Sequence, residues 1–300
     1  MSFERVAGFL ALTLAITMTS PAFAGDSNPT TQPYAKFILD FISHTDPSLQ
    51  AQVEKIDTEL REKFGMKPDQ TSVGVLDLTK AERLAMINGD RMDYGASVPK
   101  IGILLAYFDL TPRAAFELDP TIRKELGRMI KVSDNEMASK YSHLLGLRPI
   151  QAVLTKYKLW DEMHGGGIWV GKHYGKDAER YPDPISHNSH AITARQVMRF
   201  YLLMLQGKLV TPEASARMRE IFESPDIEHD QNKFVKALSG REGMKIIRKS
   251  GTWDTWFHDS AVITATGRQY ILVAITNHPK GDDYLEALAA RVDDVMQKQK

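Results

Sequence analysis

Residues 95–108 decide the fold, and they read Gly-Ala-Ser-Val-Pro-Lys-Ile-Gly-Ile-Leu-Leu-Ala-Tyr-Phe. A short polar segment leads into a stretch that is apolar almost all the way round a helix, and such a helix is usually buried. Pro99 lacks an N–H group, so it fits best in a first turn, where N–H groups have no helical partner. The pattern therefore predicts a buried helix that begins near Ser97.

Ser97 and Lys100 are three residues apart, so one helical turn places them on the same face. Burial disfavours the ammonium form of lysine, which would allow Lys100 to accept a proton. The N-terminus of a helix also favours negative charge on Ser97, so the pair is a candidate nucleophile with an internal base. Ser-x-x-Lys is common on its own, and the alternative is a capping serine beside a lysine that reaches the surface.

The composition is that of an ordinary soluble globular protein, with 43% apolar and 25% charged residues. The formal net charge is zero, which argues against nucleic acid as a partner. The chain has no cysteine, so disulfides, thiolate metal sites and a cysteine nucleophile are excluded. Four histidines in or beside a long irregular stretch lack the i, i+4 spacing of helical zinc motifs, and we predict no metal or other cofactor: His164, His173, His187 and His190.

The first 24 residues have the features of an export signal. Arg5 supplies a positive charge, residues 6–18 form a short apolar run, and Ala22-Phe23-Ala24 offers small residues where a signal peptidase reads them. A membrane anchor is the alternative, but the apolar run is short for a full span. We therefore expect cleavage after Ala24, a periplasmic or secreted location and no stable membrane anchor.

Strand-like patterns occur near both ends of the chain, and helical patterns fill the middle. This arrangement predicts an α+β fold, in which one antiparallel sheet is completed by both chain ends and an all-helical domain is inserted. The expected units are a signal peptide at 1–24, a sheet domain at 25–96 plus 244–300, and a helical domain at 97–243.

Two further polar motifs follow the serine. Ser133-Asp134-Asn135 forms a tight link between two helical patterns, and Lys249-Ser250-Gly251 ends a predicted strand. Taken alone, residues 133–135 would be read as a helix cap and nothing more, because all three residue types favour caps and turns.

The order of these motifs resembles that of the class A active-site-serine β-lactamases and the penicillin-binding proteins. Their signature is S-x-x-K, S-D-N and K-T-G, and this chain has Ser97 to Lys100, Ser133 to Asn135 and Lys249 to Gly251. Ser250 keeps the hydroxyl of the usual threonine. The resemblance runs from about residue 34 to the C-terminus and implies a β-lactamase/transpeptidase-like fold.

The resemblance also implies roles for the first two motifs. Ser97 would attack the acyl carbonyl, with Lys100 as its base or as a relay for one. Ser133 would pass a proton to the leaving nitrogen. Asn135 would hold the substrate amide and orient Lys100.

For the third motif the resemblance implies substrate binding. Lys249 and Ser250 would meet the substrate carboxylate. Gly251 would let the substrate backbone lie close to the strand. The backbone N–H groups of Ser97 and Thr252 would form the oxyanion hole.

Two features depart from the class A pattern. The separation between Ser97 and Ser133 is shorter than usual, which predicts a more open site. The E-x-x-L-N stretch that supplies the deacylating glutamate is missing, and the corresponding residues 175–182 read Gly-Lys-Asp-Ala-Glu-Arg-Tyr-Pro. Asp177 or Glu179 could position the water, but without the asparagine partner we expect slow deacylation.

The sequence therefore predicts an exported, monomeric serine hydrolase of β-lactamase type, which forms an acyl-enzyme on Ser97 and hydrolyses a β-lactam or a related amide or ester. Two alternatives remain open. One is a penicillin-binding or peptidase-like enzyme acting on peptidoglycan stem peptides. The other is a non-catalytic binding module with the same fold, against which the five polar motif residues count.

Overall fold

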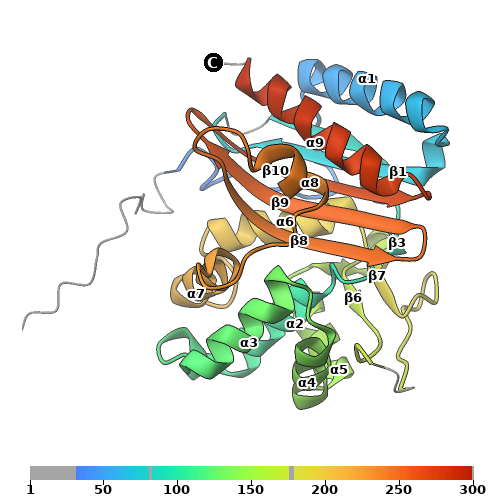
Figure 1. The fold of residues 1–300 in the computed structure, drawn as a ribbon. Helices are drawn as coiled ribbons and strands as arrows, with labels where there is room; N and C mark the ends of the chain where they lie inside the picture. The colour runs from blue at the N-terminus through green and yellow to red at the C-terminus, as the bar shows by residue number, and fades with distance from the viewer. Residues whose placement is uncertain (1–31, 81–82, 176–178, 299–300) are drawn as a thin grey trace, which may run out of the picture.

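The computed structural model describes residues 32–80, 83–175 and 179–298 (Figure 1). The predicted export signal and Asp177 therefore lie outside the described residues. Within the described ranges, no helix combines the length and apolar character that crossing a bilayer requires.

A five-stranded antiparallel sheet with the order β2-β1-β10-β9-β8 lies at the centre of the fold. Its strands are β1 (Thr71–Asp77), β2 (Arg83–Ile87), β8 (Lys245–Trp253), β9 (Trp256–Ala265) and β10 (Arg268–Asn277). The helices are α1 (Pro47–Phe64), α2 (Lys100–Leu110), α3 (Pro120–Lys131), α4 (Asn135–Leu145), α5 (Leu147–Lys156), α6 (Ala194–Leu205), α7 (Pro212–Glu223), α8 (Lys233–Leu238) and α9 (Gly281–Gln297).

Short elements occupy the segments between these helices and strands. They are β3 (Asp93–Tyr94), β4 (Trp160–Asp161), β5 (Gly166–Gly167), β6 (Trp169–Val170) and β7 (His190–Ile192), with 3-10 turns η2 (Pro68–Gln70), η3 (Pro112–Ala115) and η4 (Glu162–His164). The segment inserted into the sheet is therefore mostly helical rather than all helical.

Both ends of the chain complete the sheet, as the sequence predicts. β1 pairs antiparallel with β10, and Val73 lies opposite Ala274. β9 and β10 form a hairpin that turns at Thr266-Gly267, where Gly267 has a φ of 77°. The prediction of an α+β fold with an antiparallel sheet closed by both termini is confirmed.

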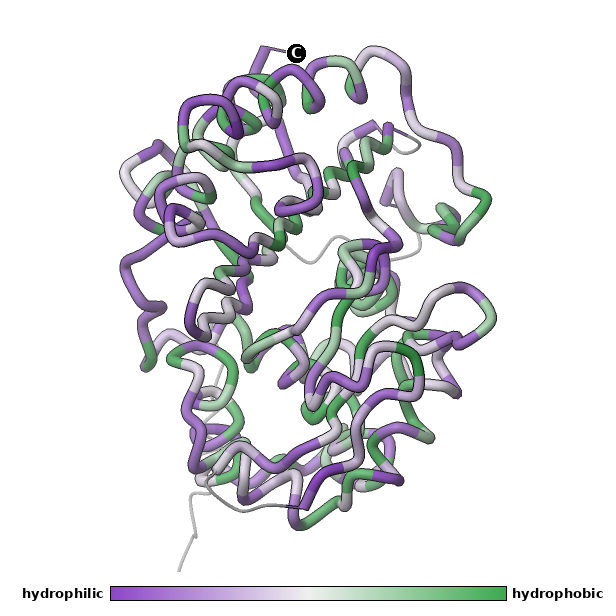
Figure 2. The backbone as a smooth tube through the Cα atoms, turned by 90° about the vertical axis from the view of Figure 1, so that its right-hand side faces the viewer, coloured by the Kyte–Doolittle hydropathy of each residue, from purple (hydrophilic) through white to green (hydrophobic). Residues whose placement is uncertain are grey.

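The sheet is covered by helices on both faces (Figure 1). Along β10, Leu272 and Ala274 pack toward α1 and α9, while Ile271 and Val273 pack toward the inserted helices. Successive side chains of a strand point to opposite faces, so this apolar strand contributes to both cores. The covering helices alternate between hydrophilic and hydrophobic along their turns (Figure 2), as amphipathic helices do.

Helix α2 runs through the inserted part of the molecule and packs against α3, α4, α5 and α7. It is buried from Lys100 to Phe108, as its apolar sequence predicts. The predicted start near Ser97 is three residues early, because the chain first makes a tight turn in which the Val98 N–H donates to the Gly95 carbonyl at 3.0 Å. Ala96 in that turn has a φ of 46°.

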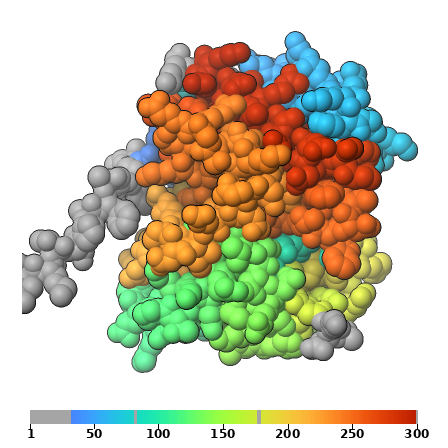
Figure 3. Space-filling view, in the orientation of Figure 1, coloured from blue at the N-terminus to red at the C-terminus, as the bar shows by residue number. Residues whose placement is uncertain are grey.

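Strand β8 forms one edge of the sheet and has only β9 beside it among the described strands. Its other edge lies against α3 and α7. In the space-filling view, the orange surface of the β8 region meets the green surface of α3 and α4 along a seam (Figure 3). The polar motifs of the sequence converge at this seam.

Candidate active site

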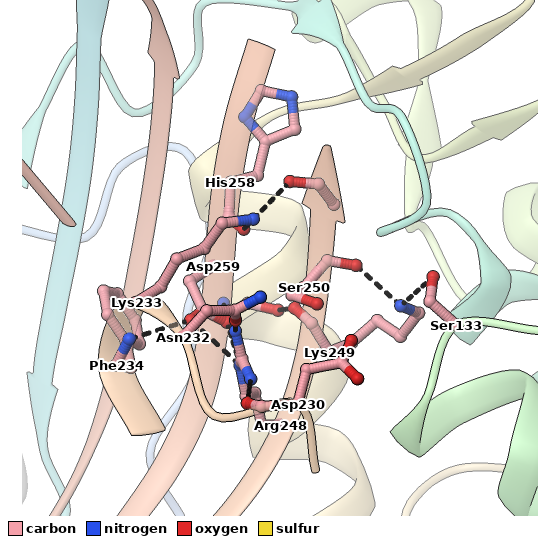
Figure 4. A network of polar contacts seen from close by, with 12 residues as sticks. Ser133, Asp230, Asn232, Lys233, Phe234, Arg248, Lys249, Ser250, His258 and Asp259 are labelled. Carbon is pink, nitrogen blue, oxygen red and sulfur yellow. Dashed lines mark hydrogen bonds and ion pairs between the residues drawn. The ribbon is translucent and has the colours of Figure 1, made fainter. Parts of the chain in front are cut away.

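The hydroxyl of Ser133 lies between two buried lysine amines. Nζ of Lys100 is 3.2 Å from Ser133 Oγ. Nζ of Lys249 is 2.9 Å from the same atom, as Figure 4 shows. Lys100 Nζ also donates to the Ser133 carbonyl at 2.6 Å and to Asn135 Oδ1 at 2.7 Å. Three segments that are far apart in the sequence, the start of α2, the α3–α4 link and β8, therefore meet at one hydroxyl.

The α3–α4 link holds Ser133 in a strained conformation. Asp134 caps α4 by accepting from the N–H groups of Glu136 and Met137, and it also pairs with Arg128 at 2.7 Å. These bonds fix the link, and Ser133 takes a φ of 59°. A left-handed conformation costs a non-glycine residue about 1–2 kcal/mol, and such strain is concentrated at functional sites.

Burial makes positive charge costly at both lysines, whose side chains are fully buried. It lowers the pKa of Lys100 from 10.5 to about 7, and the negative charge of Asp134 opposes this shift only in part. Burial, followed by the charge of Lys100, lowers the pKa of Lys249 well below its ordinary value. Because two ammonium groups around one hydroxyl repel each other, the site favours a neutral amine.

The three contacts of Lys100 Nζ suit both of its protonation states. An ammonium group donates to all three oxygens, which are the Ser133 carbonyl, Asn135 Oδ1 and Ser133 Oγ. A neutral amine, which burial favours, keeps two of these donations and accepts from the Ser133 O–H with its lone pair. In that state the bond from Lys249 to Ser133 Oγ completes a hydrogen-bonded chain from Lys249 through Ser133 to Lys100, along which a proton can move.

Ser97 lies half-buried in the turn before α2. Within the described residues, Lys100 Nζ bonds to Ser133 and Asn135 and not to the Ser97 hydroxyl. The end of β8 lies directly against this turn, since a Cβ added at Gly251 would be 3.1 Å from the Ser97 amide nitrogen and 3.2 Å from the Gly95 carbonyl oxygen. A side chain at position 251 would therefore require the strand or the turn to move by a few tenths of an ångström.

The free edge of β8 carries the backbone groups predicted to bind substrate. The Ser250 carbonyl accepts from Lys249 Nζ at 2.6 Å on the side facing Ser133. Alternate residues of a strand direct their backbone groups to the same edge, so the Thr252 N–H also faces this side. The geometry is compatible with an oxyanion hole made by the N–H groups of Ser97 and Thr252.

The side chain of Lys249 is fully buried. Its Nζ is occupied by Ser133 Oγ and the Ser250 carbonyl. The half-buried Ser250 and the exposed Thr252 are the more accessible groups of this motif. The expected contact between Lys249 and a substrate carboxylate stays a prediction, and the observed contact is with Ser133.

Of the two loop carboxylates predicted to act in deacylation, the structure describes Glu179, which is turned toward His173 rather than Lys100. Glu179 has 76% of its side chain exposed and lies 3.7 Å from Nε2 of His173. His173 in turn contacts Ser142 of α4 at 2.8 Å. Asp177 lies outside the described residues, so the roles of both carboxylates remain predictions.

An aromatic residue that the sequence analysis did not identify contacts Lys100 instead. The ring centroid of Tyr174 is 4.6 Å from Lys100 Nζ, and the Tyr174 hydroxyl donates to the Ala96 carbonyl at 3.2 Å. The ring also stacks on His190, with 4.3 Å between the ring centroids. Burial raises the pKa of the Tyr174 phenol well above 10, so it stays a neutral donor. Tyr174 belongs to none of the sequence motifs. Its position beside Lys100 depends on the path of the loop between α5 and α6.

The described residues contain no group of three histidine, aspartate or glutamate side chains that could hold a metal ion.

The contact between β8 and Ser97 predicts the effect of Gly251→Ala. The added methyl group forces the strand and the serine turn apart by a few tenths of an ångström. Displacements at a reacting centre cost up to about 100-fold in rate, so we expect acylation to slow by at least about tenfold. The cost in folding stability should be about 1–3 kcal/mol.

Stopped-flow acylation and thermal unfolding measure these two effects. Gly240→Ala is the matched control, because nothing lies within 4 Å of its added Cβ and Gly240 has no left-handed φ. Equal acylation rates for both variants would show that β8 does not need its close approach to Ser97.

The sequence model of the β-lactamase enzyme family matches residues 111–296, which is more than half of the chain. This range includes Ser133, Asn135 and Lys249 and begins after Lys100. No curated protein matches the sequence.

Solved structures with the same fold include two β-lactamases and a penicillin-binding protein. The β-lactamase of Sphaerobacter thermophilus has a TM-score of 0.65 at 14% identity, with 82% of this chain and 97% of that chain covered. The β-lactamase of Chitinophaga pinensis has a TM-score of 0.64 at 13% identity, with 84% and 98% covered. PBP-A has a TM-score of 0.61 at 14% identity, with 81% and 96% covered.

At these identities the solved structures establish the fold alone, and the family match rests on the sequence. The match extends across more than half of the chain, and its range contains the second and third motifs. This chain belongs to the β-lactamase enzyme family.

Proposed function

We propose that this protein is an exported serine hydrolase that forms an acyl-enzyme on Ser97 with a β-lactam or a related amide or ester. The observation that carries the proposal is the Ser133 hydroxyl, held between Lys100 at 3.2 Å and Lys249 at 2.9 Å. A binding module has no use for two buried amines on one hydroxyl, whose burial costs free energy. Membership of the β-lactamase family supports the same reaction class.

Acylation begins when neutral Lys100 takes the proton of Ser97 Oγ, and Oγ attacks the acyl carbonyl. The new Oγ–C bond leaves negative charge on the carbonyl oxygen, which the N–H groups of Ser97 and Thr252 stabilise. The C–N bond then breaks. Ser133 gives its proton to the leaving nitrogen and regains one from Lys100, which returns to the neutral amine.

Deacylation needs a water molecule and a group to take its proton. Two observations favour a slow step in this protein. The ring of Tyr174 covers Lys100, and the described loop carboxylate, Glu179, lies with His173 instead. A poorly held water reacts slowly, because orientation alone can be worth about 100-fold in rate. The acyl-enzyme therefore accumulates.

The same two observations favour a second candidate, a penicillin-binding-type enzyme that acts on peptidoglycan stem peptides. Such an enzyme uses the same acylation chemistry and need not hydrolyse β-lactams quickly. The fold of PBP-A is compatible with this alternative, and a variant of PBP-A has been solved as an acyl-enzyme complex with penicillin G. The features of residues 1–24 support export, and either substrate would be met outside the cytoplasm.

Mixing the protein with benzylpenicillin tests the proposed function. We expect the intact mass to rise by the mass of one penicillin and the adduct to persist, because acylation is faster than deacylation. A chromogenic cephalosporin followed by stopped flow should show a burst and then slow turnover. Ser97→Ala should abolish the adduct and the burst, with a stability change of about 1 kcal/mol. Absence of any adduct on the wild-type protein, or an adduct mapped to another residue, contradicts the proposal.

The position of Glu179 generates a separate prediction about deacylation. Because Glu179 is exposed and turned toward His173, Glu179→Gln should leave the lifetime of the acyl-enzyme unchanged within about twofold. Asp177→Asn, measured beside it, tests the other carboxylate of the loop. The decay of the adduct mass after removal of free penicillin gives both lifetimes. A lifetime at least tenfold longer for Glu179→Gln would show that this carboxylate does reach the deacylating water.

A further inference from the structure

A third buried lysine, Lys233, lies behind the end of β8 and has no part in the chemistry described so far. Its side chain is 1% exposed. Its Nζ donates to the Gly251 carbonyl at 2.8 Å, to Thr252 Oγ1 at 2.7 Å and to the His258 carbonyl at 3.2 Å (Figure 4). One cation is thus coordinated by three oxygens at the strand end that faces Ser97.

The chain holds Lys233 in place from both sides. Asn232 Oδ1 accepts from Arg248, and the Phe234 N–H donates to Asp259 at 3.1 Å. Arg248 and Asp259 themselves form a fully buried ion pair at 2.8 Å. Between these anchors Lys233 has a φ of 50°, a left-handed conformation that costs a lysine about 1–2 kcal/mol. Strain that the surrounding structure maintains in this way is concentrated at functional sites.

The covalent connectivity of the backbone links Lys233 to the proposed oxyanion hole. The Gly251 C=O and the Thr252 N–H belong to the same planar peptide unit. Lys233 donates to the oxygen of that unit, and the N–H at its other end faces the free edge of β8. A charge-assisted bond to the carbonyl withdraws electron density from the amide and makes its N–H a stronger donor. The same bond, together with the one to Thr252 Oγ1, fixes the plane of the peptide.

We propose that Lys233 is a positioning residue for acylation, which orients and polarises the Gly251–Thr252 peptide whose N–H stabilises the oxyanion. The proposal rests on the proposed function, because it needs an acyl transfer to Ser97. It differs from a substrate-binding role in its consequence, because a positioning residue affects acylation whether or not the substrate carries a carboxylate.

The ionisation of Lys233 makes its effect depend on pH. Burial lowers the pKa of Lys233 from 10.5 to about 8, with the charge of Asp259 opposing the shift. The ammonium group is therefore present below pH 8 and lost as the pH rises through that value. His258 stays neutral, because burial lowers its pKa to about 3. The other charged groups that act on Lys233 are Asp230, Arg248, Lys249 and Asp282.

The experiment compares Lys233→Met, Lys233→Arg and the control Lys236→Met in the full chain. Lys236 lies on the same helix, is exposed and pairs with Glu286 at 2.7 Å. For each variant, acylation is measured by stopped flow from pH 6 to pH 10, with a carboxylate-bearing cephalosporin and with a neutral activated ester. The infrared stretch of the acyl carbonyl in the penicillin adduct reports the strength of the oxyanion hole directly.

Lys233→Met should slow acylation about 10- to 100-fold with both substrates. This effect is smaller than that of removing an oxyanion-hole donor, because the Thr252 N–H remains in place. It should also raise the acyl carbonyl frequency and remove the fall in rate above pH 8. Lys233→Arg, which keeps the charge, should recover much of the rate and move that fall to higher pH. Lys236→Met should match the wild type.

Three results would overturn the proposal. The first is an equal acylation rate for Lys233→Met and Lys236→Met. The second is a loss of rate in Lys233→Met that is confined to the carboxylate-bearing substrate. The third is an acyl carbonyl frequency in Lys233→Met that equals that of the wild type. If Lys233→Met does not fold, the Lys233→Arg variant decides. A fall in its acylation rate at the same pH as in the wild type contradicts the proposal. A wild-type protein that forms no acyl-enzyme refutes the proposed function and this inference together.

Discussion

The site depends on one electrostatic constraint, which is that two fully buried lysine amines share the half-buried Ser133 hydroxyl. Burial weakens the screening of charge by water, so two ammonium groups would repel each other there. Burial lowers the pKa of Lys100 to about 7, and burial together with the charge of Lys100 lowers the pKa of Lys249. In the proposed mechanism, the neutral amine that burial favours at Lys100 is the base for Ser97.

The fold supplies this constraint by bringing three separate segments to one edge of a sheet. The free edge of β8 contributes Lys249, the start of α2 contributes Lys100, and the α3–α4 link contributes Ser133. Each segment is fixed by ordinary packing, but two residues at the junction, Ala96 and Ser133, have left-handed backbones. This strain persists because the packing around the three segments holds both residues in place.

The sequence predicted the sheet and the polar motifs because both have local signatures. Alternating apolar residues mark the strands, and Ser133 and Lys249 stand in short motifs whose order is informative. Tyr174 and Lys233 could not be predicted, because each acts through contacts with residues more than fifteen positions away and neither stands in a motif. The start of α2 at Lys100 was also missed, because a turn closed by backbone hydrogen bonds leaves no clear mark in the residue pattern.

The protonation state of Lys100 is the central claim, and nuclear magnetic resonance of protein labelled with ¹³C and ¹⁵N at lysine measures it directly. The Lys100 signal is assigned by its absence from the spectrum of Lys100→Arg. The account predicts that the Cε and Nζ shifts of Lys100 titrate near pH 7, so that the neutral amine predominates at pH 8 in the free enzyme. A Lys100 signal that remains that of an ammonium group up to pH 10 would contradict it.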